Sequence, residues 1–226
     1  MGDNRETGGA TPIRDVVGGF DAVRTDVVVG SDRVALWCVE DLERYVDREA
    51  LLRADDPPEP PYWAYCWCGA RVLAERVPRN AGRVIELGCG LGLPGLIAAR
   101  RGADVVFTDQ LAPPLAFVAA SLAANGLVAR GCVVADLGRP AWRAAFDLVL
   151  ASEVLYDRAA FVRIATALRD MLAPGGQALL ADGHRIDTTD FYAVAEAAGL
   201  VAVREDVRVV EEGLPTTITI ATLRVA

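Results

Sequence analysis

Four closely spaced glycines, Gly88, Gly90, Gly92 and Gly95, follow a short apolar run, and the next apolar run ends in a carboxylate, Asp109. Glycine allows the positive φ angles of a sharp strand-to-helix turn and leaves the backbone open to a ligand lying on it. A carboxylate at the tip of the following strand can accept hydrogen bonds from ribose hydroxyls. These residues therefore predict a turn that binds a nucleoside.

The identity of the nucleoside depends on two further residues. The spacing from Gly90 to Gly95 matches the dinucleotide pattern G-x-G-x-x-G, with an acid about 20 residues later. However, Pro94 lacks the backbone N–H that a pyrophosphate would bind, and Glu86 places an acid where dinucleotide-binding strands are usually apolar. An acid at this point suits a cationic ligand better. An NAD-binding oxidoreductase and a non-catalytic nucleoside-binding module remain as alternatives.

The composition argues against several classes of partner. The chain has 226 residues and a formal net charge of −8, with no basic block, so we expect no nucleic acid partner. No apolar run is long enough to span a membrane. Five scattered cysteines and a single histidine, His184, do not form a metal-binding pattern, and they predict a reducing cytoplasm with no metal site.

The order of apolar runs predicts an α/β fold: a Rossmann-like, seven-stranded, mostly parallel sheet with an antiparallel C-terminal hairpin strand and a small N-terminal extension. Strands are expected at 84–87, 103–108, 131–136, 146–153, 177–182, 200–210 and 216–225. Helices are expected at 69–77, after Gly95 through Arg101, and at 113–125, 158–172 and 190–198. Pro174-Gly-Gly176 is expected to close the fourth helix.

Three segments are expected along the chain. Residues 1–12 are polar, without an apolar period, and predict a disordered tail. Residues 13–61 predict an extension that contains a hairpin at 25–38, an amphipathic helix at 40–53 and a proline-rich linker. Residues 62–226 form the main domain.

Acids recur where the predicted parallel strands end. Because the carboxyl ends of such strands meet at one edge of the sheet, where ligands bind, we expect these acids to share that edge. They are Glu86, Asp109, Asp136, Glu153 and Asp182. Just before the first helix of the domain, residues 62–67 contain four aromatic side chains, which could pack in the core or cover the nucleoside, or do both.

The segment Glu86-Leu-Gly-Cys-Gly-Leu-Gly92 resembles the first motif of the class I, seven-β-strand S-adenosylmethionine-dependent methyltransferases, and the similarity extends over residues 60–226. Within that superfamily, Pro60-Pro-Tyr-Trp-Ala-Tyr-Cys-Trp67 and Glu153-Val-Leu-Tyr156 resemble the branch of protein lysine methyltransferases. In that branch, the chain resembles the electron-transfer-flavoprotein β-subunit lysine methyltransferases.

The resemblance implies S-adenosylmethionine as cofactor, S-adenosylhomocysteine as product, and a role for each residue that matches. Cofactor contacts are implied for Trp67, Glu86, Gly88, Cys89, Gly90, Asp109, Gln110, Asp136, Leu137 and Ser152. Glu153 and Tyr156 are implied to face the acceptor amine as catalytic residues.

Methyl transfer from a sulfonium requires little of the protein beyond aligning the acceptor and excluding water. We expect an amine acceptor, on the exposed lysine of a protein substrate. A small-molecule N- or O-methyltransferase on the same scaffold is the alternative, with His184 as a candidate base for a hydroxyl acceptor. A helix-terminal carboxylate and a packed tyrosine are the structural alternatives for Glu153 and Tyr156.

Overall fold

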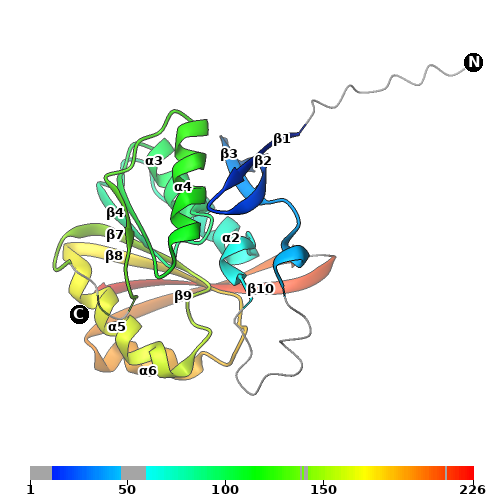
Figure 1. Cartoon of the computed structure of the whole chain (residues 1–226). Helices are drawn as coiled ribbons and strands as arrows, with labels where there is room; N and C mark the ends of the chain where they lie inside the picture. Colours follow the sequence, from blue (N-terminus) through cyan, green and yellow to red (C-terminus); the bar gives the residue numbers. More distant parts are fainter. Residues whose placement is uncertain (1–11, 47–59, 138, 140–141, 212) are drawn as a thin grey trace, which may run out of the picture.

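A seven-stranded sheet runs through the centre of the computed structural model, which describes residues 12–46, 60–137, 139, 142–211 and 213–226. The strands follow the order β6-β5-β4-β7-β8-β10-β9 across the sheet (Figure 1). Their bounds are β4 Arg83–Leu87, β5 Asp104–Asp109, β6 Gly131–Val134, β7 Phe146–Ser152, β8 Leu172–Asp182, β9 Leu200–Glu211 and β10 Leu214–Val225.

The sheet is parallel except at one strand. Ile85 in the central strand β4 lies beside Val106 of β5 and Val149 of β7, both in parallel register. Strand β10 pairs antiparallel with β8 on one side and with β9 on the other. The predicted fold class, with its antiparallel strand in the C-terminal hairpin, is therefore confirmed.

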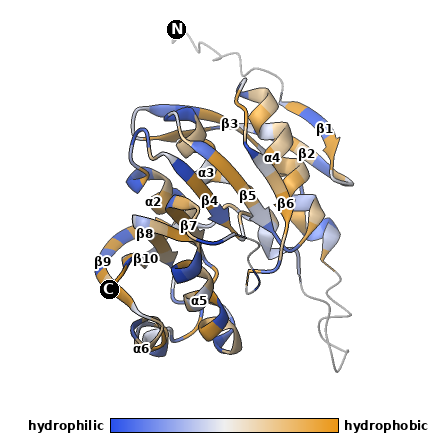
Figure 2. Ribbon diagram, turned by 90° about the vertical axis from the view of Figure 1, so that its left-hand side faces the viewer, coloured by the Kyte–Doolittle hydropathy of each residue, from blue (hydrophilic) through white to orange (hydrophobic). Residues whose placement is uncertain are grey.

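Helices cover both faces of the sheet. Helices α2 (Cys68–Arg76), α3 (Leu93–Arg100) and α4 (Ala112–Ala124) lie on one face, and α5 (Phe161–Met171) and α6 (Thr189–Ala197) lie on the other (Figure 1). Alternate residues of each strand point to opposite faces, so Val84 and Ile85 belong to two different hydrophobic clusters. Figure 2 shows the middle of strand β5 coloured as hydrophobic, as expected for a strand buried on both faces.

The N-terminal extension forms a second, antiparallel sheet from β1 (Ile13–Val17), β2 (Phe20–Val29) and β3 (Asp32–Val39). Helix α4 and the residue that ends it hold this sheet. The Asn125 amide exchanges two hydrogen bonds with the backbone of Ala35, at 2.9 and 2.7 Å, and Ser121 Oγ accepts one from Trp37 N. The predicted hairpin is present, and β1 adds a strand that the sequence did not indicate.

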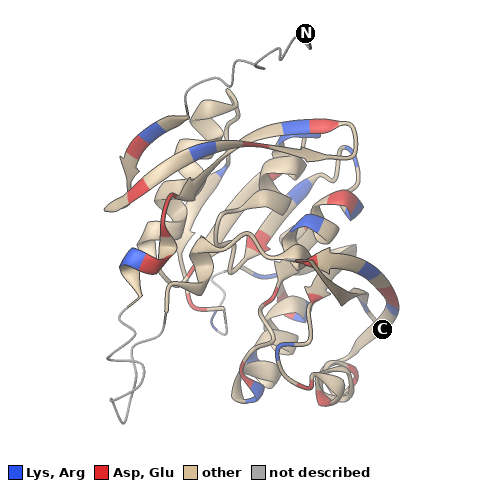
Figure 3. Ribbon diagram, turned by 90° about the vertical axis from the view of Figure 1, so that its right-hand side faces the viewer, with Lys and Arg blue, Asp and Glu red and all other residues tan. Residues whose placement is uncertain are grey.

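Charges of both signs alternate over the small N-terminal sheet (Figure 3). Arg33 pairs with Asp26 across β2 and β3, and Arg44 pairs with Asp21. A further pair, between Arg101 and Asp32 at 2.8 Å, is largely buried and joins the end of α3 to the start of β3. This contact fixes the small sheet against the helices of the main domain.

Two local predictions were wrong. Where an amphipathic helix was expected from residue 40, the described part contains one 3-10 turn, Leu42–Tyr45, and an extended Val46. The Tyr45 ring packs on Phe20 and its hydroxyl accepts a hydrogen bond from Asp21 N, and these tertiary contacts outweigh helix propensity.

The second error concerns Pro174-Gly-Gly176. Helix α5 ends at Met171, and the three residues lie inside β8, where its pairing with β7 shifts register between Phe146 and Leu148. A Cβ at Gly176 would lie 2.9 Å from the Phe146 carbonyl oxygen, so glycine is needed for the close backbone approach at this irregularity.

The tail at residues 1–11, the rest of the expected helix to residue 53 and most of the proline-rich linker lie outside the described residues. Among the helices that the structure describes, none combines the length and the apolar character needed to cross a bilayer.

Candidate functional site

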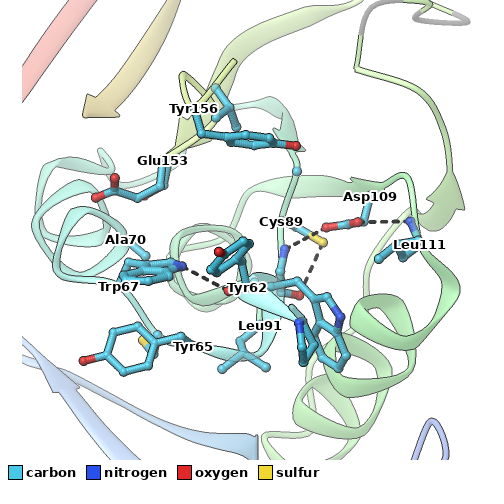
Figure 4. A pocket seen from close by; sticks show the side chains of 18 of the residues that line it. Tyr62, Tyr65, Trp67, Ala70, Cys89, Leu91, Asp109, Leu111, Glu153 and Tyr156 are labelled. Atoms are coloured by element: carbon cyan, nitrogen blue, oxygen red, sulfur yellow. Dashed lines mark hydrogen bonds between the residues drawn. The ribbon is translucent and has the colours of Figure 1, made fainter. Parts of the chain in front are cut away.

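A cavity of about 710 Å³ opens at the carboxyl edge of β4, β5 and β7, a volume typical of small-molecule sites. Figure 4 shows Asp109 on one side of it and Trp67 and Glu153 on the other, with Tyr156 across one end. Its lining residues come from the aromatic segment before α2, the glycine turn, and the loops after β5, β6, β7 and β8.

The glycine turn after β4 forms one wall of this cavity. Gly88, Gly90 and Gly92 have φ angles of 55°, 51° and 75°, which glycine adopts without strain. A Cβ on Gly90 would lie 2.9 Å from the Trp63 carbonyl oxygen, so the aromatic segment closes directly on the turn. The turn therefore presents bare backbone to the cavity, as the sequence predicted.

Glu86 lies fully buried at the end of β4 and accepts a hydrogen bond from Gly95 N at 2.8 Å. Burial raises the pKa of this carboxyl to about 8, against the single backbone hydrogen bond that lowers it. A buried acid with so high a pKa is a feature of functional sites.

Asp109 ends β5 and is oriented by two backbone amides. Its Oδ2 accepts from Gly90 N and its Oδ1 from Leu111 N, each at 3.1 Å (Figure 4). Burial raises the pKa of this carboxyl as well, while the backbone hydrogen bonds oppose the shift. Both oxygens keep further lone pairs, so a fixed carboxylate faces the cavity where the two ribose hydroxyls are expected.

The buried Glu86 predicts a decline in stability as pH rises. Its pKa is raised in the folded protein, so between about pH 4.5 and pH 8 the folded state binds more protons than the unfolded state. The free energy of unfolding should therefore fall across this window, by a contribution on the order of 5 kcal/mol, and level off above it. Urea unfolding at pH 5.5 to 8.5 measures the slope.

Glu86→Gln is the control for that measurement, because an amide of the same shape does not titrate. It should reduce the slope but not remove it, since burial also raises the pKa values of Asp109 and Glu153. A wild-type stability that increases over the same window would contradict the assignment.

Glu153 follows β7 in a strained conformation, with a φ of 56° that non-glycine residues rarely adopt. Its backbone N–H donates to Ala181 O, and its Oε2 accepts from Gly183 N at 3.1 Å. Burial raises the pKa of the carboxyl, and the nearby Arg185 lowers it. The strain is typical of residues that a site holds in place for a function.

Two residues that line this cavity each carry a buried oxygen without a hydrogen-bond partner among the described residues, Ser152 through Oγ and Glu153 through Oε1. A buried polar atom without a partner carries a desolvation cost unless a ligand satisfies it. The end of β7 and the residue after it are therefore suited to a polar ligand.

The aromatic segment serves both of the purposes that the sequence allowed. Trp63 packs against Phe117 and Phe20, with ring centroids 5.4 and 5.2 Å apart. Tyr65 and Trp67 pack against each other at 4.4 Å and line the cavity. The segment thus anchors on the core through one ring and covers the cavity with the next two.

Most of the sequence-predicted site residues line the cavity: Trp67, Glu86, Gly88, Cys89, Gly90, Asp109, Gln110, Leu137, Ser152, Glu153 and Tyr156. Asp136 does not. Strand β6 ends at Val134, so Asp136 lies in the following loop with its side chain exposed. The functional roles of the residues that do line the cavity remain predictions.

Two other residues expected near this edge lie apart from the cavity. The buried Asp182 accepts hydrogen bonds from Thr188 Oγ1 and His184 N, which satisfy it locally. The His184 ring is hydrogen-bonded through Nε2 to Thr219, at 2.8 Å. A role for His184 as base for a hydroxyl acceptor therefore has no geometric support.

Sequence reasoning missed several lining residues. Tyr62 and Tyr65 were noted only as part of an aromatic cluster, and Leu111, Ile186 and Arg185 were not assigned. Leu111 and Ile186 lie a few residues after strand-end acids, and that position is the one signal that could have identified them.

The fold is that of an α/β class found in solved methyltransferase structures. The solved structure of a TehB-like S-adenosylmethionine-dependent methyltransferase from Corynebacterium glutamicum superposes with a TM-score of 0.54 at 21% identity, covering 72% of this chain and 89% of that one. This likeness shows the fold.

Sequence comparison gives the family. The family described as lysine methyltransferase matches residues 68–195, and the chain belongs to it. An electron transfer flavoprotein beta subunit lysine methyltransferase from Danio rerio is 31% identical over 145 residues, which cover 58% of this chain and 53% of that protein.

A ubiquinone biosynthesis O-methyltransferase from Cereibacter sphaeroides is 37% identical over 109 residues, covering 47% of this chain and 43% of that protein. The chain thus spans about half the length of the curated relatives it matches.

Membership of this family makes S-adenosylmethionine the cofactor of this protein. The residues present fit it. The cavity combines a bare glycine turn, a fixed carboxylate at Asp109, and a further acid, Glu86, next to the turn. Ser152 and Glu153 add oxygens that lack a hydrogen-bond partner within the described ranges.

Proposed function

We propose that this protein transfers a methyl group from S-adenosylmethionine to the side-chain amine of a lysine in a protein substrate. Membership of the lysine methyltransferase family supports the reaction type. The observation that carries the acceptor assignment is Glu153: it is held in a strained loop, and its buried Oε1 has no hydrogen-bond partner in the part of the chain that the structure describes. The N–H of an amine is a donor that satisfies such an oxygen.

The bound cofactor supplies an electrophilic methyl group on a sulfonium. The protein has three tasks around it. Asp109, fixed by Gly90 N and Leu111 N, binds the ribose hydroxyls and sets the register of the cofactor. Tyr65 and Trp67 cover the cavity and exclude water.

The third task is to present the amine. A lysine must react as the free base, so its ammonium form has to give up a proton before methyl transfer. Glu153 Oε1 accepts a hydrogen bond from the amine nitrogen and directs its lone pair, and the raised pKa of this carboxyl suits it to hold the departing proton. Tyr156, at one end of the cavity, limits the direction of approach (Figure 4).

A small-molecule acceptor is the second candidate, and one observation favours it: a stretch of this chain is 37% identical to a ubiquinone biosynthesis O-methyltransferase.

Two exposed side chains favour a protein substrate instead. Tyr62, which is 54% exposed, and Leu111, which is 45% exposed, line the cavity. Exposed apolar side chains around a site are what a protein substrate would cover.

The proposed compartment is the cytoplasm. The five cysteines are free, which is consistent with this proposal.

A melting experiment tests the cofactor class. S-adenosylhomocysteine at about one hundred times its dissociation constant should add about 2.7 kcal/mol and raise the melting temperature by about 5 to 10 °C. NAD at the same concentration should leave it unchanged. A shift with NAD alone would contradict the proposal.

The acceptor class is tested by transfer of labelled methyl groups into a cell lysate, followed by separation of protein from small molecules. We expect label in protein, released as methylated lysine on acid hydrolysis. Label confined to the small-molecule fraction would support the second candidate.

A further inference from the structure

Arg185 lies in the loop after β8 and reaches the acceptor side of the cavity, next to Glu153. Its guanidinium carbon is 3.9 Å from the centroid of the Trp67 ring, a cation–π distance. Its Nε is 3.7 Å from Glu153 Oε2, and its Nη2 is 3.7 Å from Glu211 Oε2. A cation of this protein therefore occupies a position between one aromatic face and two carboxylates.

The three groups around the guanidinium are each fixed by a backbone hydrogen bond of 3.1 Å. Gly183 N donates to Glu153 Oε2, Cys68 N donates to Glu211 Oε1, and Trp67 Nε1 donates to Tyr62 O. The side chains of Glu153 and Glu211 are only 7% and 16% exposed. They form a rigid and mostly dehydrated receptor for a positive charge.

The guanidinium itself is held loosely. Its side chain is 40% exposed, and among the residues that the structure describes it forms no hydrogen bond, only the two ion pairs and the ring contact. Exposed ion pairs and exposed cation–π contacts are each weak. The groups that form the receptor are therefore held more firmly than the Arg185 guanidinium is held against them.

Two glycines let the Glu153 carboxylate pack closely against the backbone. A Cβ on Gly69 would lie 2.2 Å from Glu153 Oε1, and a Cβ on Gly183 would lie 2.8 Å from the same atom. A side chain at either position would displace the carboxylate. The placement of Glu153 beside Arg185 therefore depends on both glycines.

We infer that Trp67, Glu153 and Glu211 form a cation subsite for the lysine amine of the acceptor, and that Arg185 occupies this subsite in the free protein as an internal competitor. The inference rests on the proposed lysine methylation. Because the acceptor binds only when Arg185 has left, its apparent affinity is reduced by the fraction of molecules in which the subsite is vacant.

The charges argue against Arg185 as an anchor for the carboxylate of the cofactor. An incoming carboxylate would approach a guanidinium that already lies between Glu153 and Glu211, so it would meet two negative charges for one positive charge. An incoming ammonium or amine would meet the two carboxylates without an opposing positive charge, once the guanidinium has moved toward solvent.

Arg185→Gln tests the inference, because it removes the competing charge and keeps a polar side chain. We expect the KM for a lysine peptide to fall by about threefold to tenfold, with kcat nearly unchanged. Arg204→Gln is the matched control: Arg204 also stacks on an aromatic ring, that of Tyr192, but lies outside the cavity. Its KM should equal that of the wild type.

A binding measurement makes the test independent of methyl transfer. With S-adenosylhomocysteine present, n-butylammonium should change the tryptophan emission through Trp67, and it should bind more tightly to Arg185→Gln than to the wild type. The neutral probe n-butanol should show no such difference, and Trp67→Phe should lose the signal.

Two outcomes would overturn the inference. One is an unchanged affinity of Arg185→Gln for both the peptide and n-butylammonium. The other is a weaker affinity for S-adenosylhomocysteine with an unchanged affinity for 5′-methylthioadenosine, which lacks the carboxylate and would place Arg185 on the cofactor. If n-butylammonium binds as expected but no lysine is methylated, the cation subsite stands and the proposed function fails.

Discussion

Glu153→Gln is expected to lower kcat for lysine methylation by about a hundredfold or more, in the range of a lost general acid–base group. Gln keeps an oxygen that can accept from Gly183 N, so the loop geometry should survive, but it cannot hold the proton of the amine. The affinity for S-adenosylhomocysteine should stay within about twofold of the wild type. Single-turnover transfer to a lysine peptide and calorimetric titration measure the two quantities.

The control for this variant is Glu205→Gln. Glu205 lies on β9, and its carboxylate forms an exposed ion pair with Arg76 of α2. This substitution should leave kcat unchanged. Tyr156→Phe, examined in the same assay, should cause a smaller loss than Glu153→Gln because only the direction of approach is affected. Unchanged turnover in both Glu153→Gln and Tyr156→Phe would remove their catalytic assignment.

The second large effect is expected from Gly95→Ala, which should lower the free energy of unfolding by about 3 kcal/mol. A Cβ at this position would lie 2.3 Å from a ring carbon of Phe107 and 2.4 Å from Glu86 Oε2. Both atoms belong to fully or nearly fully buried side chains, so neither can move aside freely. Urea unfolding measures the loss, and cofactor affinity should fall with it as Glu86 is displaced.

Gly131→Ala provides the comparison. Gly131 does not have a positive φ, and its added Cβ would meet only Val133 Cγ2 at 3.7 Å, an ordinary contact. The free energy of unfolding of this variant should stay within about 1 kcal/mol of the wild-type value, and any change should be an increase. Equal stabilities for the two alanine variants would show that the close packing around Gly95 is not as described.

Fold prediction from the sequence succeeded where local patterns and topology rules agree. Two kinds of local pattern indicated one conformation each. They are the glycine turn between β4 and α3 and the apolar runs of β5 and β7. Prediction failed where contacts between distant residues decide the conformation. Tyr45 is held by Phe20 and Asp21, and Pro174-Gly-Gly176 lies within a strand because β7 pairs with β8 on both sides of it, at Leu172 and at Gln177.

The candidate site shows the same division. The acids that end central strands, Glu86 and Asp109, were placed from sequence because strand ends are predictable. Asp136 was not, since strand β6 ends two residues earlier than its pattern indicated. The contact of Arg185 with Glu211 joins the loop after β8 to the last residue of β9, and no spacing within one segment indicates such a contact.

The docking of the small N-terminal sheet decides where the protein can be divided. Residues 68–195 match the family, yet Leu36 and Trp37 of β3 belong to the same hydrophobic cluster as Phe117 of α4. At the other end, β10 lies between β8 and β9 in the main sheet. A fragment cut at the limits of similarity would thus open the core on one side and unpair the sheet on the other. Residues 68–195, which match the family, therefore do not form a unit that would fold by itself.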